Sequence, residues 1–121
     1  MLNNNLLPLG SVVYLQEGSI PVMVVLRRPI LNIEEQSYYF DYAGVNQIIG
    51  LEPDKISYFN QENISKIVFE GYINEYEERV QQGLLKWEEK NNQVQLTIAN
   101  YDNFILLTQL KFLFHLCLEY P

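Results

Sequence analysis

The chain has 121 residues, of which 48% are hydrophobic, so a single domain covering residues 1–121 can bury a core without disulfides or metal ions. Its formal net charge of −7 comes from 15 acidic and 8 basic residues, which argues against binding to nucleic acid or to an anionic membrane surface. Cys117 is the single cysteine, and this excludes an internal disulfide and a cysteine-based metal site.

Five β-strands are predicted in the first part of the chain, where β-branched and aromatic residues are separated by turn formers. Residues 17–19 connect the first two strands as a hairpin. Pro29 ends the second strand, and the residues from there to Gln36 are expected to form a loop. Asn60 is suited to cap the turn before the fifth strand. The predicted strands span residues 11–16, 22–28, 37–42, 56–59 and 64–70.

The stretch 64–72 has the sharpest local pattern of the chain. Ile67 and Phe69 point to one side of a strand, and the residues between and beside them point to the other side. Gly71 then ends the strand. This alternation is typical of a strand with one face in the core, so we expect Ile67 and Phe69 to face the core.

A first helix is predicted after Asn74, which is a suitable N-cap because glutamates crowd the next turn and lysines lie toward the end. Residues 91–92 end this helix, and residues 93–99 alternate as a further strand would. One apolar stripe runs along the predicted helix and consists of Tyr76, Val80, Leu84 and Trp87.

Residues 103–118 predict a second helix that is apolar except for one narrow polar stripe. Lys111 and His115 interrupt it, and it is shorter than the about 20 apolar residues that span a membrane. Two interpretations remain open: the helix packs over the sheet as core, or part of it binds a partner protein. The partner-binding positions would then be among Phe104, Leu107, Phe112 and Leu116.

Together these elements predict an α+β fold in which a small antiparallel sheet, open or barrel-like, is followed by two C-terminal helices. The β-rich core would cover residues 7–78 and the helical part residues 79–121. Because residues 1–5 carry no positive charge and no long apolar run follows them, we expect a cytoplasmic protein without membrane insertion.

No pattern of side chains predicts catalysis, a metal or a cofactor. His115 and Cys117 lie two residues apart, and on a helix they would point about 200° away from each other, which does not make a catalytic dyad. Adjacent acids such as Glu77 and Glu78 also face apart and are expected to be solvated. We therefore expect no catalytic, cofactor-binding or metal-binding residues, and an enzyme is the least favoured class.

Four sequence blocks follow one another across residues 7–78. They read LPLGSVVYL at 7–15, VMVV at 22–25, FDYAGV at 40–45 and YFNQENI at 58–64 continuing into IVFEGY at 67–72. In this order they resemble a small family of unknown function from Gram-positive bacteria, whose genes lie beside those for LXG-domain toxins and type VII secretion. Residues 47–50 replace the Pro-Glu-Gly-like turn usual in that family, and residues 91–121 lie outside the resemblance.

This resemblance implies a non-enzymatic, chaperone-like accessory protein that binds an LXG-type toxin, or another protein partner, before type VII secretion. An immunity protein that neutralises a cognate toxin is the alternative, because inhibitors of nucleases are often acidic. The resemblance carries no catalytic residues to this chain and leaves open which toxin is bound.

Overall fold

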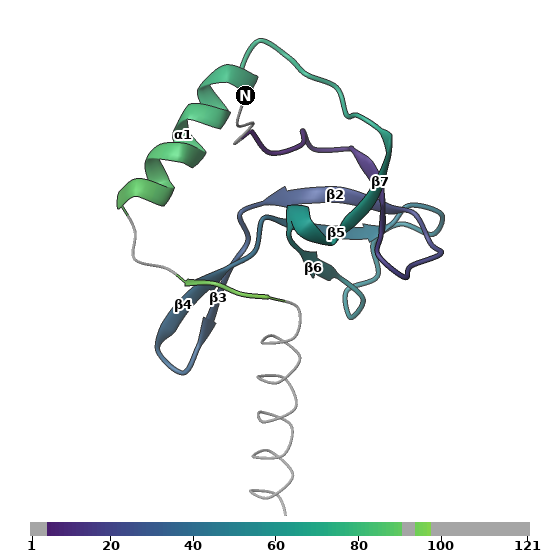
Figure 1. The fold of residues 1–121 in the computed structure, drawn as a ribbon, viewed down its shortest axis with the longest axis horizontal. Coiled ribbons are helices and arrows are strands. Elements are labelled where there is room, and N and C mark those ends of the chain that lie inside the picture. The colour runs from purple at the N-terminus through teal and green to yellow at the C-terminus, as the bar shows by residue number, and fades with distance from the viewer. Residues whose placement is uncertain (1–4, 91–93, 98–121) are drawn as a thin grey trace, which may run out of the picture.

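The computed structural model describes residues 5–90 and 94–97, which form two β-sheets and one α-helix (Figure 1). The elements in chain order are β1 (Val12–Leu15), β2 (Val22–Arg27), β3 (Ile30–Ile33), β4 (Gln36–Tyr39), β5 (Tyr42–Asn46), β6 (Ser57–Phe59), a 3-10 turn η1 (Gln61–Asn63), β7 (Ile64–Phe69), α1 (Glu77–Lys90) and β8 (Val94–Gln95).

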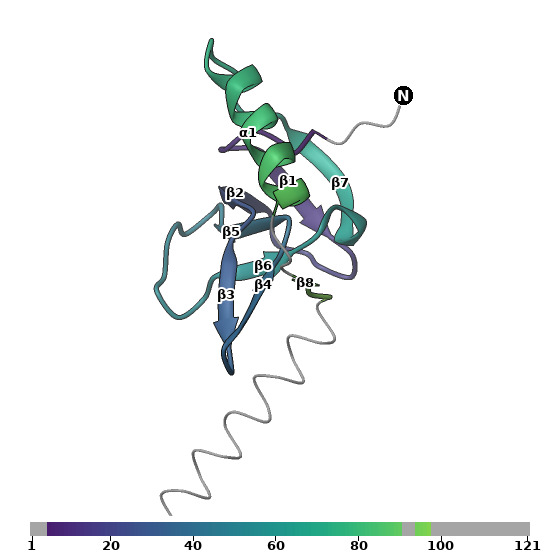
Figure 2. The same cartoon turned by 90° about the vertical axis from the view of Figure 1, so that its left-hand side faces the viewer.

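The larger sheet has five antiparallel strands in the order β6-β5-β2-β1-β7. The smaller sheet has the order β3-β4-β8, in which β8 runs parallel to β4. The tip of the β3–β4 hairpin points away from α1 in both views of the molecule (Figures 1 and 2). The α+β class is therefore confirmed, but the larger sheet is open and does not close into a barrel.

The core lies on the face of the larger sheet that is directed toward α1. Its buried members come from the N-terminal segment and from β1, β2, β5 and β6, and Leu84 of α1 packs against them. The N-terminal segment runs between α1 and β2 (Figure 1), since Leu6 bonds to α1 and the Gly10 N–H donates to the Val24 carbonyl at 2.8 Å. The buried residues of this cluster are Leu6, Val13, Val22, Val24, Tyr42 and Phe59.

The secondary structure of two segments differs from the prediction. Residues 29–36, expected to be a loop, form β3 and the tight turn into β4. Glu34 and Glu35 both have positive φ angles, 49° and 68°, as a type I′ hairpin turn requires. That turn usually contains Asn or Gly, so two glutamates gave no signal for it. The predicted strand 37–42 is in fact divided between β4 and β5, because the chain changes sheets at residues 40–41.

The prediction for Ile67 and Phe69 is wrong, because β7 carries a β-bulge. Val13 pairs with Ile67 and Val12 pairs with Phe69, so Val68 is the extra residue and the strict alternation is broken. Paired residues share a face of the sheet, which places Ile67 on the core face and Phe69 on the opposite face. At the edge of the sheet both remain exposed, at 50% and 58%.

The prediction of two C-terminal helices is not borne out. The first predicted helix is α1, preceded by Asn74, whose Oδ1 accepts a hydrogen bond from the Tyr76 N–H at 2.9 Å. It is the one α-helix among the described residues. The second predicted helix, 103–118, lies outside those residues. Of the predicted strand 93–99, the structure describes β8 and the two residues after it, while residues 93, 98 and 99 lie outside the described ranges.

Candidate functional site

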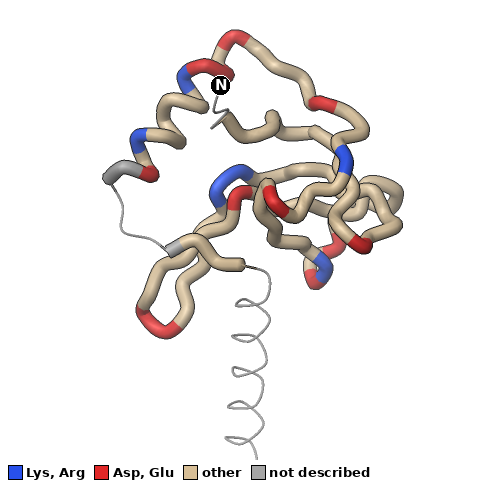
Figure 3. Tube along the Cα trace, in the orientation of Figure 1, with Lys and Arg blue, Asp and Glu red and all other residues tan. Residues whose placement is uncertain are grey.

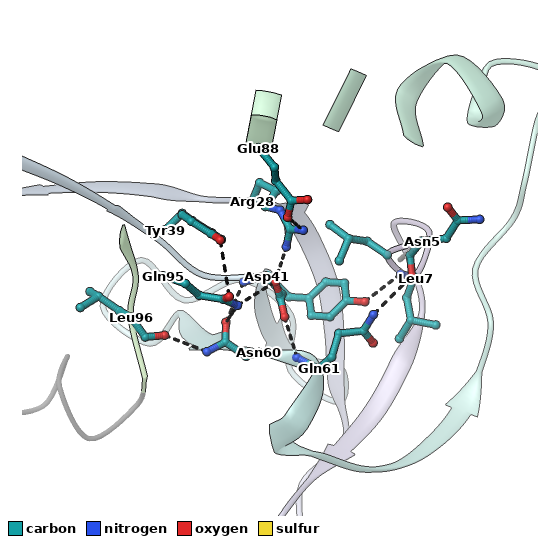
Figure 4. A network of polar contacts seen from close by, with 12 residues as sticks. Asn5, Leu7, Arg28, Tyr39, Asp41, Asn60, Gln61, Glu88, Gln95 and Leu96 are labelled. Carbon is teal, nitrogen blue, oxygen red and sulfur yellow. Dashed lines mark hydrogen bonds and ion pairs between the residues drawn. The ribbon is translucent and has the colours of Figure 1, made fainter. Parts of the chain in front are cut away.

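Arg28 is the centre of a buried polar network that joins both sheets to α1 (Figure 4). It follows β2 in a left-handed conformation, with φ of 54°, and its side chain is 9% exposed. Its guanidinium forms ion pairs with Asp41, between β4 and β5, and with Glu88 of α1. It also lies over the ring of Tyr39, 5.4 Å from its centroid.

Asp41 and Asn60 extend this network to the end of the described chain. The Asp41 carboxylate accepts hydrogen bonds from the Gln61 N–H and from Gln95 Nε2, both at 2.9 Å. Asn60 Oδ1 accepts from the Asp41 N–H at 2.9 Å, and its Nδ2 donates to the Leu96 carbonyl at 2.7 Å. The polar atoms of Asp41 and Asn60 are already hydrogen-bonded within the protein. The network therefore has the character of a structural network and not of a site that binds a substrate.

A second polar cluster holds the start of α1. Gln81 bonds to both main-chain groups of Leu6, accepting from its N–H at 3.1 Å and donating to its carbonyl at 2.7 Å. Glu77 accepts from Arg27 at 2.7 Å and from Gln81 at 2.6 Å. Burial alone would raise the pKa of Glu77, but these hydrogen bonds and the charge of Arg27 outweigh it and hold the pKa below its usual value.

An acidic groove of about 620 Å³ lies between the N-terminal segment and the start of α1. Its remaining walls come from the connection between β7 and α1, which carries acidic residues at its two ends (Figure 3). Among the described residues that line it, none is a lysine or an arginine. The acidic members are Glu70, Glu75, Glu77 and Glu78, and the apolar members include Leu7, Pro8, Ile73 and Leu85.

An apolar groove of about 450 Å³ lies on the face of the larger sheet opposite the core. No charged residue is among the described residues that line it. The solvent face of an antiparallel sheet is usually polar, so an apolar one indicates a contact surface. The lining residues are Gly10, Val12, Tyr14, Pro21, Met23, Gln47, Val68 and Phe69.

The two grooves adjoin where β7 ends. Phe69 lines the apolar groove and Glu70 the acidic one, just as Gly10 lines the first and Pro8 the second. The next residue after Glu70, Gly71, crosses so close to the N-terminal segment that a Cβ there would lie 2.2 Å from the Leu9 carbonyl oxygen. The lining of one groove passes into that of the other at this crossing, along both segments of the chain.

A comparison with protein-family models matches residues 6–80 to a domain of unknown function, DUF4176. The match covers more than half of the chain. The chain belongs to this family. A search of curated proteins and a search of solved structures each found no match.

The DUF4176 region contains both grooves except for Asn5, Gln81, Gln82 and Leu85 of the acidic one. The predicted partner-binding residues Phe104, Leu107, Phe112 and Leu116 lie outside the residues that the structure describes, and so do His115 and Cys117. Within the described ranges, no three His, Cys, Asp or Glu side chains are grouped so as to hold a metal ion. No helix of that part is long and apolar enough to cross a membrane.

Neither groove was predicted from the sequence. One signal was present in the sequence: Ile67, Val68 and Phe69 are three consecutive apolar residues in a strand that was expected to have a single apolar face. A continuous apolar run at an edge strand indicates apolar side chains on both faces. The acidic groove had no such signal, because its walls are far apart in sequence.

Proposed function

We propose that this DUF4176 protein is a non-enzymatic, chaperone-like accessory protein that binds an LXG-type toxin in the cytoplasm before type VII secretion. The observation that supports it best is the apolar surface formed by β7 and the residues that follow. Val68, Phe69, Tyr72 and Ile73 are 51%, 58%, 83% and 52% exposed. An exposed apolar surface of this kind is typical of protein–protein contacts. The toxin as partner is supported by the resemblance of the sequence blocks.

Co-expression with the LXG toxin encoded beside the gene tests this proposal. The tagged protein should retain the toxin through gel filtration, and deletion of its gene should reduce secretion of that toxin while secretion of an unrelated type VII substrate continues. Fractionation of cells should place the protein in the cytoplasm. Absence of a complex with each LXG toxin of the same locus would contradict the proposal.

An immunity protein is the second candidate, and the acidic groove is the specific observation that favours it. A surface lined by four glutamates is complementary to a basic active site such as that of a nuclease. The two functions can be distinguished by expressing the active domain of the toxin separately from the rest of the toxin. An immunity protein should protect cells that express the active domain alone, whereas an export chaperone should bind the remaining part of the toxin and give no protection.

The residues Phe104, Leu107, Phe112 and Leu116 remain predicted partner contacts. We expect that at least one of them, changed to Glu, gives a soluble protein with a near-native melting temperature that no longer binds the toxin. A contact exposed in the free protein contributes little to its stability, whereas truncation of a buried Leu or Phe costs about 2–5 kcal/mol. If all four substitutions unfold the protein, this segment belongs to the core.

A further inference from the structure

We infer that the apolar groove and the adjoining acidic groove form one docking surface for a segment of a partner protein that is apolar at one end and carries Lys or Arg at the other. This inference rests on the proposed function only in that the partner is a protein. What is new is which surface binds the partner and which side chains the bound segment carries.

The apolar end of the surface is built from neighbouring strands. Val12 and Phe69 are direct partners in the β1–β7 ladder, and Val12 also pairs with Met23 of β2, so the three side chains share one face. Val68, the bulged residue, lines the same groove. Phe69 is 58% exposed, and covering it would remove apolar surface from water at about 25 cal/mol per Å². This end therefore favours apolar side chains.

The acidic end supplies charges that the fold does not neutralise. Glu77 forms an ion pair with Arg27 and accepts a hydrogen bond from Gln81. By contrast, Glu70, Glu75 and Glu78 take part in no ion pair with the rest of the described chain. The basic residues nearby do not compensate, since Arg79 stacks on the ring of Tyr76 at 5.3 Å and lines neither groove. Charge complementarity therefore selects a segment with Lys or Arg at this end.

A second copy of this chain fits the surface poorly. Two copies joined along β7 would bring like charges together, since each carries a formal net charge of −7 and the glutamates beside the strand. The register shifts between β1 and β7, and Lys66 on the edge strand, are also features that discourage edge-to-edge pairing of sheets. A basic partner segment is attracted by the glutamates and does not need to pair with the edge of the sheet.

The test measures binding of the full-length chain to the LXG toxin encoded beside it, with two matched pairs of variants. Phe69→Glu should weaken binding at least tenfold, whereas Ile49→Glu, at an exposed apolar residue outside both grooves, should leave it within twofold. The triple variant E70K/E75K/E78K should also weaken binding at least tenfold. The triple variant E17K/D54K/E62K makes the same change of net charge elsewhere on the surface and should have a much smaller effect.

Melting temperatures verify that each variant is folded, and Val68→Glu replaces Phe69→Glu if the latter is unstable. Toxin binding that is unchanged in Phe69→Glu, Val68→Glu and the acidic-groove variant overturns the inference and leaves the proposed function intact. If the wild-type chain does not bind the toxin, the proposed function fails. The inference is then decided with immobilised 15-residue peptides whose apolar half is followed by lysines or, as control, by glutamates. Selective binding of the lysine series, lost in Phe69→Glu, supports the inference, and absence of binding overturns it.

Discussion

Gly71 is the residue at which a single added methyl group should be most damaging. Its N–H donates to Ser11 Oγ at 2.9 Å, and that hydroxyl in turn donates to the Pro8 carbonyl at 2.7 Å. A Cβ at position 71 would lie 2.2 Å from the Leu9 oxygen and 2.9 Å from the Ser11 nitrogen, both of which are backbone atoms and cannot rotate away. We expect Gly71→Ala to lower the free energy of unfolding by about 1–3 kcal/mol, measured by urea denaturation.

The control for this change is Gly83→Ala in α1. No atom lies within 4 Å of a Cβ built at Gly83. Alanine in a helix interior is favoured over glycine by about 1 kcal/mol, so this variant should be more stable than the wild type. Equal effects of the two substitutions would show that the crossing at Gly71 is not tight.

Asp41 is the residue whose loss should most weaken the buried polar network. Its side chain is 11% exposed and that of Arg28 is 9% exposed. In Asp41→Ala, Arg28 keeps Glu88 but loses its more buried partner, and the Gln61 N–H and Gln95 lose an acceptor. Breaking a buried pair costs about 3–5 kcal/mol, and we expect a loss in this range from thermal or urea unfolding.

Glu52→Ala is the matched comparison for the Asp41 variant. Glu52 pairs with Lys55 at 3.5 Å on the surface, where the Lys55 side chain is 73% exposed. A pair of this kind contributes about 0–1 kcal/mol. A loss for Asp41→Ala no larger than that for Glu52→Ala would contradict the structural importance given to the network.

Glu77 should make stability depend on pH in the acidic range. Its pKa is lowered in the folded state from the ordinary value of 4.5, so the folded protein binds a proton there less readily than the unfolded chain. The stability it contributes is present above about pH 4.5 and is lost as pH falls through the folded pKa. Urea unfolding of Glu77→Gln and wild type should therefore differ at neutral pH, and the difference should shrink below about pH 4.5.

At the scale of elements, α1 is attached mainly by polar contacts. Gln81 connects α1 to the N-terminal segment. Glu77 connects it to Arg27 of β2, and Glu88 connects it to Arg28, the residue after β2. The Trp87 ring contacts the Tyr39 ring edge-on, with 5.4 Å between the centroids. Such contacts require defined geometry, so they place the helix at one position over the core. The acidic groove exists because α1 is held there.

The short strand β8 should contribute more stability than its two residues suggest. The Leu96 N–H donates to the Tyr39 carbonyl at 2.9 Å, and the Leu96 side chain is 1% exposed. A chain ending at residue 93 lacks this burial and the two Gln95 hydrogen bonds to Asp41 and Asn60. We expect it to melt at a lower temperature than a chain ending at residue 97, by the equivalent of about 2–5 kcal/mol for one large buried side chain. Equal melting temperatures would exclude β8 from the core.

At the scale of the whole molecule, the two faces of the larger sheet have different roles. One face is covered by α1 and the N-terminal segment and holds the buried core. The other presents the apolar groove, whose lining ends at Phe69, one residue before the acidic groove begins at Glu70. No described segment covers this apolar sheet face. Such a face is suited to bind another protein, and this supports the proposed accessory role.

The α+β class, most strand positions, the α1 region and the acidic character of the chain could be predicted from the sequence, because these depend on local periodicity, capping and composition. The sequence did not determine the second sheet, the Glu34–Glu35 turn or the bulge at Val68. These depend on which strands pair and in what register. Tertiary packing brings Pro8, Gly71 and α1 together, and the acidic groove arises from that contact between segments distant in sequence.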